Sequence, residues 1–233
     1  IKKLKKQVSD FKVAHRQARI EVKRVFRERV IESLDRVPQK VAVIGNSPSV
    51  LEKESGQFID SCDVVIRINN FQTAGFEKYI GSKTDFAIFT AASKPNPEVV
   101  RLPPNRRLLH AANYHASKEK LQARLMAENG IGLKVSEVTS IPPTLYFYGL
   151  ATLMGLPSGS WPSTGSVALQ LAMDVFSTHK CDIYFTGIDF FKNTGREIDH
   201  YFSHTSLSDG KHNSHLEANY FDRYIYSDEV IRI

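Results

Sequence analysis

The sequence has few cysteines and no long apolar run, and each shortage excludes a class of protein. Two cysteines among 233 residues, Cys62 and Cys181, are too few for a disulfide scaffold or a cysteine-based zinc site. No stretch approaches 18 consecutive apolar residues, so we expect no transmembrane helix within the chain. The Asn-x-Ser/Thr sequence that accepts N-linked glycans is also absent, which argues against a glycosylated protein of the secretory pathway.

The net charge of +6 is concentrated in one terminal segment. Residues 1–36 contain 12 basic and five acidic side chains, whereas residues 37–233 contain 19 basic and 20 acidic ones. A nearly neutral body argues against a broad nucleic-acid groove, which needs basic side chains to neutralise phosphates. We therefore predict no nucleic-acid partner.

Residues 1–36 lack glycine and proline and are predicted to form a basic helix, which Pro38 ends. Apolar residues recur along it in steps of mostly three and four, and these are Leu4, Val8, Phe11, Ala18, Val22 and Val25. Three interpretations stay open: a solvated helix that packs on its own domain, an oligomerising stem, or a helix attracted peripherally to an anionic membrane. We assign residues 1–38 to a basic helical stem and residues 39–233 to one globular domain.

Short β-branched apolar runs alternate with helical patterns after residue 39. Runs typical of buried strands cover residues 41–45, 63–69, 85–89, 107–111 and 182–187. Helical patterns cover residues 117–128 and 167–177. This alternation predicts an α/β protein with a Rossmann-like, doubly wound and mostly parallel sheet.

Two loops that precede helices are suited to an anionic ligand. Residues 45–49 directly follow the first strand, where open α/β sheets bind ligands, and Asn46 offers both a donor and an acceptor. Residues 162–166 open the 167–177 helix, whose dipole favours a negative group. Taken alone, Ser163 or Thr164 is better explained by an ordinary N-cap, and the two loops together are a stronger indication than either one. Neither loop has the spacing of a GxGxxG fingerprint or a P-loop.

The last 35 residues contain four of the eight histidines, His200, His204, His212 and His215. No third ligand follows at a separation familiar from zinc sites, so we predict no metal site. A histidine in the turn-rich segment 209–213 is better suited to general acid or base catalysis, because imidazole titrates near neutral pH. Asp-x-Asp, the usual carboxylate clamp for a metal-bound nucleoside diphosphate, is also absent.

Four motifs, in a fixed order, resemble those of the animal-type sialyltransferases. Residues 41–84 are similar to the long sialylmotif of that family, and residues 162–187 to the short sialylmotif. His200-Tyr201-Phe202 resembles the third motif, and His212 with Glu217 five positions later resembles the very short His-x4-Glu motif. The shared order of all four is more specific than any one of them.

The resemblance implies a variant Rossmann fold and an inverting, metal-independent transfer from CMP-sialic acid to a hydroxyl group of a glycan acceptor, without a cofactor. It implies that His212 is the general base, that His200 binds the departing CMP phosphate, and that Glu217 supports the site. It also implies a donor site made of Gly45, Asn46, Ser47, Asn69, Trp161, Ser163, Thr164, Gly165 and Gly187.

The sequence departs from the family pattern at several positions. Val41 stands where the family usually has a cysteine that pairs with the equivalent of Cys181, and Trp161 stands where a tyrosine is common. These departures lead us to expect a bacterial or otherwise cytoplasmic protein at the inner face of a membrane. An anchor that precedes residue 1 would instead place it in the Golgi lumen.

Two further questions stay open at the level of the sequence. The motifs do not separate CMP-sialic acid from CMP-Kdo as the donor, so a CMP-Kdo transferase of bacterial surface polysaccharide is an alternative. A non-catalytic nucleotide-sugar-binding assembly module and a phosphate-handling hydrolase are alternatives from other classes.

Overall fold

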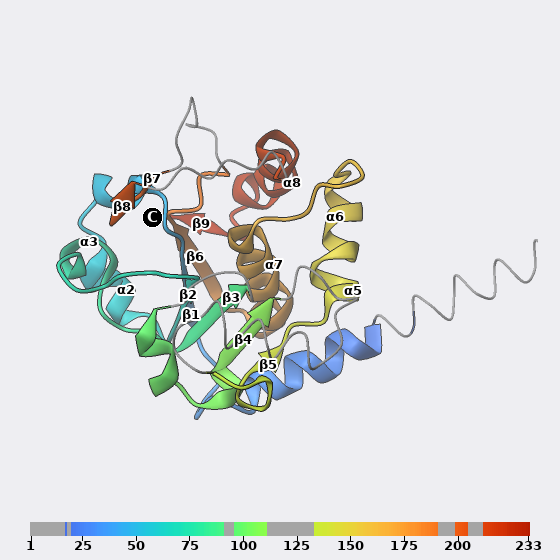
Figure 1. The fold of residues 1–233 in the computed structure, drawn as a ribbon, viewed down its shortest axis with the longest axis horizontal. Coiled ribbons are helices and arrows are strands. Elements are labelled where there is room, and N and C mark those ends of the chain that lie inside the picture. Colours follow the sequence, from blue (N-terminus) through green and yellow to red (C-terminus); the bar gives the residue numbers. More distant parts are fainter. Residues whose placement is uncertain (1–16, 18–19, 91–95, 111–132, 191–198, 205–211) are drawn as a thin grey trace, which may run out of the picture.

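A parallel sheet of seven strands forms the centre of the structure (Figure 1), a computed structural model that describes residues 17, 20–90, 96–110, 133–190, 199–204 and 212–233. The strands run in the order β5-β4-β3-β2-β1-β6-β9, and every neighbouring pair is parallel. Their bounds are β1 Lys40–Ile44, β2 Val64–Ile68, β3 Phe86–Thr90, β4 Arg107–His110, β5 Thr139–Ser140, β6 Asp182–Thr186 and β9 Ile231–Arg232. The chain therefore builds outward from β1 to β5 and then returns to place β6 on the other side of β1, which confirms the predicted doubly wound sheet.

Helices cover both faces of this sheet (Figure 1). One face carries α2 Gly56–Ser61 and α3 Glu77–Ile80, and the other carries α5 Pro143–Tyr146, α6 Tyr148–Met154, α7 Thr164–Phe176 and α8 Ser214–Tyr226. Short 3-10 helices are η1 Pro48–Glu52, η2 Pro97–Arg101, η3 Pro104–Arg106, η4 Val135–Glu137 and η5 Ser177–His179. A separate antiparallel hairpin is formed by β7 Asp199–His200 and β8 Ser203–His204.

The residues of β1 explain why both faces need helices. Val41 and Val43 are buried in the main core with α7, whereas Ala42 and Ile44 are buried in a second cluster with Ile59 of α2. Successive strand residues point to opposite faces, so a continuous apolar run makes both faces apolar. Such a strand is stable only in the interior of the sheet, between two helical layers.

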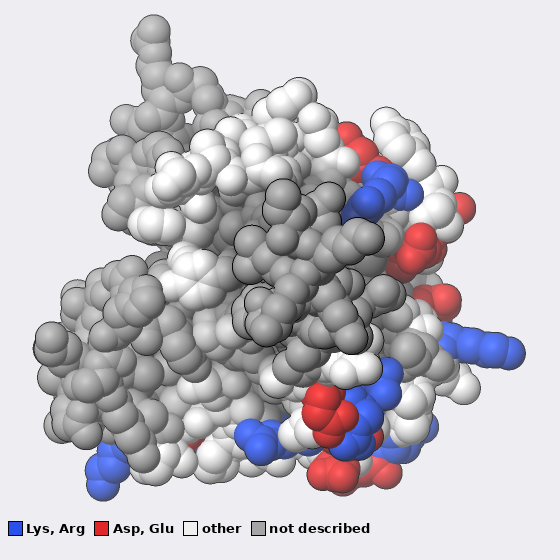
Figure 2. All heavy atoms as spheres, turned by 90° about the vertical axis from the view of Figure 1, so that its right-hand side faces the viewer, with Lys and Arg blue, Asp and Glu red and all other residues white. Residues whose placement is uncertain are grey.

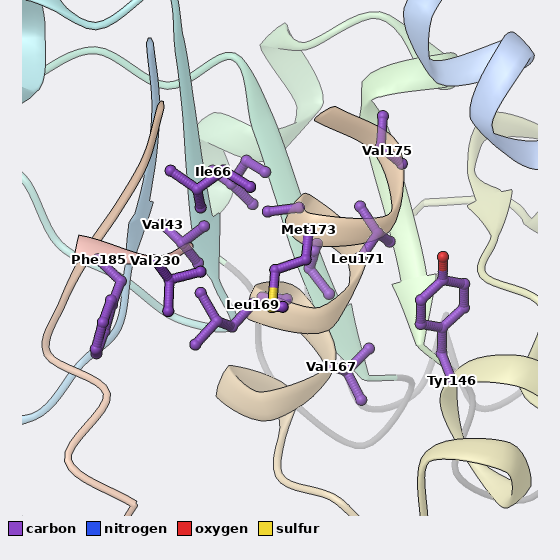
Figure 3. Packing of buried hydrophobic residues seen from close by; sticks show 14 of the residues in the cluster. Val43, Ile66, Tyr146, Val167, Leu169, Leu171, Met173, Val175, Phe185 and Val230 are labelled. Carbon is purple, nitrogen blue, oxygen red and sulfur yellow. The ribbon is translucent and has the colours of Figure 1, made fainter. Parts of the chain in front are cut away.

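Helix α7 forms the centre of the layer on the main-core face. Ten of its 13 residues are buried, and Figure 3 shows its side chains between those of the sheet, such as Val43 and Phe185, and the ring of Tyr146. The helix begins at Thr164, three residues before the predicted start, because Ser163 caps it through a bond from the Ser166 N–H to the Ser163 hydroxyl.

Two strands of the seven-stranded sheet, and both strands of the separate hairpin, were missing from the sequence prediction. The strands β5 and β9 have two residues each, too few to produce a periodic pattern, and both lie at the edges of the sheet. The predicted helix over residues 117–128 lies outside the described residues. The thiols of Cys62 and Cys181 are both free and buried, so no disulfide joins them.

The described part of the terminal segment is a helix over residues 20–31 that packs on the domain. Phe26 and Val30 are buried in the main core, and Lys23 pairs with Asp174 of α7. Val25, which the apolar pattern places on the packing side, is 42% exposed. The side chains that attach this helix to the domain therefore differ from those that the regular apolar pattern indicates.

Most of the terminal positive charge lies outside the described residues. Residues 1–19 contain seven basic and one acidic side chain, whereas residues 20–36 contain five and four. Figure 2 shows basic and acidic side chains interspersed on the face that includes the 20–31 helix. Lipid attachment and oligomerisation through residues 1–36 stay predictions. In the described part of the chain, no helix combines the length and apolar character that crossing a bilayer requires.

The packing of the 20–31 helix predicts unequal effects of one substitution at two positions. Val30→Ala should lower the free energy of unfolding by about 2 kcal/mol, because Val30 is 1% exposed and truncation leaves a cavity. Val25→Ala, on the same helix, is the matched control and should change it by less than about 0.5 kcal/mol. Equal effects in denaturant unfolding would contradict this packing.

Candidate active site

Two glycine loops meet where the strand order reverses between β1 and β6. Gly45 follows β1 and Gly187 follows β6, and a Cβ at Gly45 would lie 2.0 Å from the Gly187 carbonyl oxygen. Gly187 also has φ of +67°, in the left-handed region that side chains disfavour. Glycine at both positions therefore allows the loops to touch, at the crevice where open α/β sheets bind ligands.

The first loop is held by hydrogen bonds on both sides of Asn46. The side-chain amide of Asn46 donates to the Ile68 carbonyl at 3.2 Å. The backbone carbonyl of Asn46 accepts a bond from the Tyr201 N–H at 3.1 Å. The buried Asn46 Oδ1 has no hydrogen-bond partner among the described residues. Ser47 uses both of its donors within the protein, since its N–H bonds to Gly187 and its hydroxyl to Asp189. Asn46 thus offers a ligand an acceptor, and Ser47 acts mainly as a support.

Asn69 lies beside Asn46 at the same edge of the sheet. It directly follows Ile68, the last residue of β2, and has φ of +49°, which asparagine tolerates better than most residues. Its Oδ1 accepts a long bond of 3.4 Å from the Thr90 N–H at the end of β3. The structure therefore brings the two predicted donor-site asparagines together.

A buried carboxylate occupies the N-terminal end of α7. Glu217 is fully buried, and its Oε2 accepts bonds from the Ser163 N–H at 3.0 Å, the Ser163 hydroxyl at 2.7 Å and the Ser166 hydroxyl. The positive end of the helix dipole also stabilises a negative charge at this position. The anion that this helix end stabilises is therefore Glu217 itself.

His212, just before α8, lies against both Trp161 and Glu217. Its Nδ1 lies 2.9 Å from the Trp161 carbonyl oxygen and 4.0 Å from Glu217 Oε1. A carbonyl oxygen only accepts, so Nδ1 carries the proton and the neutral ring has its lone pair on Nε2. This arrangement suits a general base.

A buried histidine that none of the sequence motifs indicates lies close to this base. His110 ends β4 and is 2% exposed, and its ring lies 5.8 Å from that of Phe147, which lies 5.9 Å from Trp161. Burial, with a smaller effect of the charge on His212, lowers the pKa of His110 to about 4. His110 is therefore neutral near pH 7. Its one signal in the sequence is a polar residue at the carboxyl end of a predicted strand.

The β7–β8 hairpin brings His200 to the first loop. The N–H of the neighbouring Tyr201 donates to the Asn46 backbone carbonyl. The Tyr201 hydroxyl donates to the Gln72 carbonyl at 2.5 Å and accepts a bond from the Gln72 N–H at 3.0 Å. Its ring packs edge-on against Phe76 at 4.9 Å. Burial raises the pKa of Tyr201 to about 12, so the hydroxyl stays a donor. Tyr201 thus attaches the strand that carries His200 to two loops.

The predicted site residues fall into two groups that touch. The first surrounds the Gly45 loop and contains Gly45, Asn46, Ser47, Asn69, Gly187 and His200. The second surrounds the start of α7 and contains Trp161, Ser163, Thr164, Gly165, His212 and Glu217. Gly165 joins them, because a Cβ there would lie 3.1 Å from a side-chain atom of Ile188, the residue after Gly187.

The remaining histidines of the C-terminal cluster have other surroundings. Nε2 of His215, on α8, lies 3.0 Å from the amide nitrogen of Asn219, and the side chain of His204 lies outside the described part. Within that described part, no three His, Cys, Asp or Glu side chains are grouped closely enough to hold a metal ion.

The family profile and the similar proteins that the chain is compared with below all point to one family. The profile of glycosyltransferase family 29 (sialyltransferase) matches residues 10–226. The chain is 29% identical over 187 residues to the CMP-N-acetylneuraminate-beta-1,4-galactoside alpha-2,3-sialyltransferase of Rattus norvegicus, which covers 70% of this chain and 48% of that protein. It is 23% identical over 227 residues to the type 2 lactosamine alpha-2,3-sialyltransferase of Pan troglodytes, covering 88% and 67%. The chain thus spans about half the length of the first of these relatives and two thirds of the second.

Further matches come from a plant protein and from solved structures. A beta-1,6-galactosyltransferase of Arabidopsis thaliana is 44% identical over 50 residues, which is 22% of this chain and 13% of that protein. The crystal structure of a mammalian sialyltransferase aligns with a TM-score of 0.60 at 17% identity and covers 91% of this chain and 78% of the other. A structure of a mammalian sialyltransferase in complex with Gal-beta-1-3GalNAc-ortho-nitrophenol aligns with a TM-score of 0.57 at 18% identity, covering 89% and 78%. These structural matches show a shared fold.

The buried His110 predicts how stability depends on pH. Its pKa is about 4 in the folded chain, against an ordinary value of 6.5, so the unfolded chain binds more protons between these values. The stability that His110 contributes is complete above pH 6.5 and is lost as the pH falls, by about 3 kcal/mol at pH 4. Denaturant unfolding of the wild type and of His110→Phe across this range should give a shallower pH dependence for the variant. Identical pH profiles would show that His110 takes up a proton in the folded chain as readily as in the unfolded one.

Proposed function

Because the chain belongs to glycosyltransferase family 29, the sialyltransferase family, we propose that it transfers sialic acid from CMP-sialic acid to a hydroxyl group of a glycan. The observation that carries this proposal is the contact between His212 and the Trp161 carbonyl, which leaves a lone pair on the other ring nitrogen. The reaction needs such a base, because the acceptor hydroxyl loses its proton as the new glycosidic bond forms. CMP leaves with the electron pair of the bond that breaks.

In this proposal His212 is the catalytic base and Glu217 is a positioning residue. The carbonyl contact fixes which nitrogen of His212 accepts the proton. Glu217 Oε1, at 4.0 Å from Nδ1, stabilises the imidazolium that results, while its other oxygen stays bonded to Ser163 and Ser166. The Trp161 carbonyl therefore orients the base, and Glu217 compensates the charge that the base gains.

We place the CMP phosphate on the His200 side of the site. Carboxylates already lie at both loops that precede helices, Glu217 at the start of α7 and Asp189 at the Gly45 loop, and both repel another anion. His200 belongs to a hairpin bonded to the Asn46 carbonyl and has an imidazole that donates a bond to a leaving phosphate when protonated. The hydroxyl of Thr164 and the backbone of Thr164 and Gly165 then contact the uncharged cytidine, while Ser163, bonded to Glu217, holds this segment in place.

A single displacement, and therefore inversion at the anomeric carbon, is the course that we propose. A double displacement needs a nucleophile that is free to attack that carbon. The carboxylates of Asp189 and Glu217 both accept bonds from protein hydroxyls, which favours roles as supports. The charge of the leaving CMP is met by side chains in this proposal, without a metal ion or a cofactor.

The proposal predicts CMP release from CMP-sialic acid that depends on a glycan acceptor. The names of the relatives make galactosides and lactosamine the first acceptors to try. Product analysis should find transferred sialic acid with inverted configuration, with equal rates in the presence and absence of a chelator. Transfer from CMP-Kdo or from nucleotide-activated galactose, with none from CMP-sialic acid, would show that the proposed donor is wrong.

His212→Ala should reduce the transfer rate by roughly 10² to 10⁴-fold, because the acceptor hydroxyl then lacks a base. CMP binding, measured by calorimetry, should change little. His215→Ala is the matched control, because His215 lies three residues away, is exposed and contacts Asn219. A His212→Ala variant that transfers sialic acid at the wild-type rate would contradict the assignment of the base.

A further inference from the structure

The carboxylate of Asp189 joins the loops that follow β1 and β6, although neither the motifs nor the proposed reaction uses it. It accepts a bond from the hydroxyl of Ser47 through one oxygen and from the hydroxyl of Ser49 through the other, at 2.8 Å for Ser49. Asp189 lies two residues after Gly187, and both serines lie on the Gly45 loop. The contact therefore links residues separated by about 140 positions in the sequence.

The bonds to Asp189 complete a set that fixes the Gly45 loop against the loop after β6. The Gly45 N–H bonds to the Thr186 carbonyl at 2.8 Å, and the Ser47 N–H bonds to the Gly187 carbonyl at 3.0 Å. Asn46, between these two points, is buried and has an Oδ1 without a hydrogen-bond partner in the described part of the chain. The direction in which Asn46 points thus depends on how firmly its neighbours are held.

The chemistry of Asp189 fits support rather than contact with the donor. A carboxylate has two acceptor oxygens and can bind two hydroxyl donors at once, whereas the amide of asparagine has one acceptor oxygen. A negative group that faced a CMP phosphate would repel it. Two hydroxyls that donate to Asp189 stabilise its charge and direct both oxygens toward the protein.

We propose that Asp189 is a positioning residue for the nucleotide: through Ser47 and Ser49 it holds the Gly45 loop so that Asn46 Oδ1 faces the donor. This inference rests on the proposed function, in that the nucleotide is the CMP part of the donor. It assigns to Asp189 an effect on CMP affinity that the residue exerts without touching CMP.

The test is CMP binding by isothermal titration calorimetry with the full chain. Asp189→Asn should weaken CMP binding by about tenfold, because a charge-assisted bond to one serine is lost and the loop is freed. Asp182→Asn is the matched control: Asp182 is exposed, begins the same strand β6, and lies at the end opposite to the site. It should bind CMP as the wild type does.

A double-mutant cycle shows whether Asp189 acts through the serines. Ser49→Ala removes one hydroxyl at a half-buried position and should weaken CMP binding by a smaller factor, with little change in thermal unfolding. Added to Asp189→Asn, it should cause a smaller loss than in the wild type, because the charge-assisted bond that the two groups share is already weakened. The Ser49→Ala variant keeps the test valid even where Asp189→Asn lowers the stability of the fold.

The outcomes separate the inference from the function on which it rests. Wild-type CMP affinity in both Asp189→Asn and Ser49→Ala would overturn the role of Asp189, and so would losses that multiply in the double variant. A wild-type chain that does not bind CMP would overturn the proposed function and this inference together. Weaker binding in both single variants, with a loss in the double variant that is smaller than the product of the two single losses, supports the inference.

Discussion

The buried carboxylate of Glu217 is the interaction on which the site depends. A carboxylate with no exposed surface is costly unless hydrogen bonds compensate its charge, and Ser163 and Ser166 supply three of them. These bonds join the first turn of α8 to the first turn of α7. They therefore fix the segment before α8, which contains His212, against the segment before α7, which contains Trp161.

Much of the chemistry follows from this one ion. Since Glu217 satisfies the positive end of α7, we propose that this helix end binds an uncharged part of the donor and that the phosphate is bound elsewhere. The same carboxylate also lies 4.0 Å from Nδ1 of His212 through its other oxygen, Oε1. On the other side of the site, Asp189 holds the Gly45 loop in a similar way, through serine hydroxyls. Two internal carboxylates thus shape the place where an anionic donor is proposed to bind.

Local patterns in the sequence predicted the centre of the fold, and long-range contacts determined the rest. The apolar runs before Gly45 and Gly187 identified β1 and β6, because strands buried on both faces need continuous apolar residues. The bonds of Glu217 and the neutrality of His110 come from packing between distant segments, which residue order does not encode locally. Val25 shows the reverse, since a regular helical pattern placed it on the packing side and the fold leaves it exposed.

The most direct test is a double-mutant cycle on Glu217 and Ser166, read as the free energy of unfolding in denaturant. Glu217→Gln should lower it by about 3 kcal/mol, because a neutral amide oxygen at the place of Oε2 accepts the same three bonds without the charge that strengthens them. Ser166→Ala should lower it by about 1 kcal/mol in the wild type and by less in the Glu217→Gln background, since the two groups share a bond. A Glu217→Gln variant as stable as the wild type, or two effects that simply add, would contradict the central role of this carboxylate.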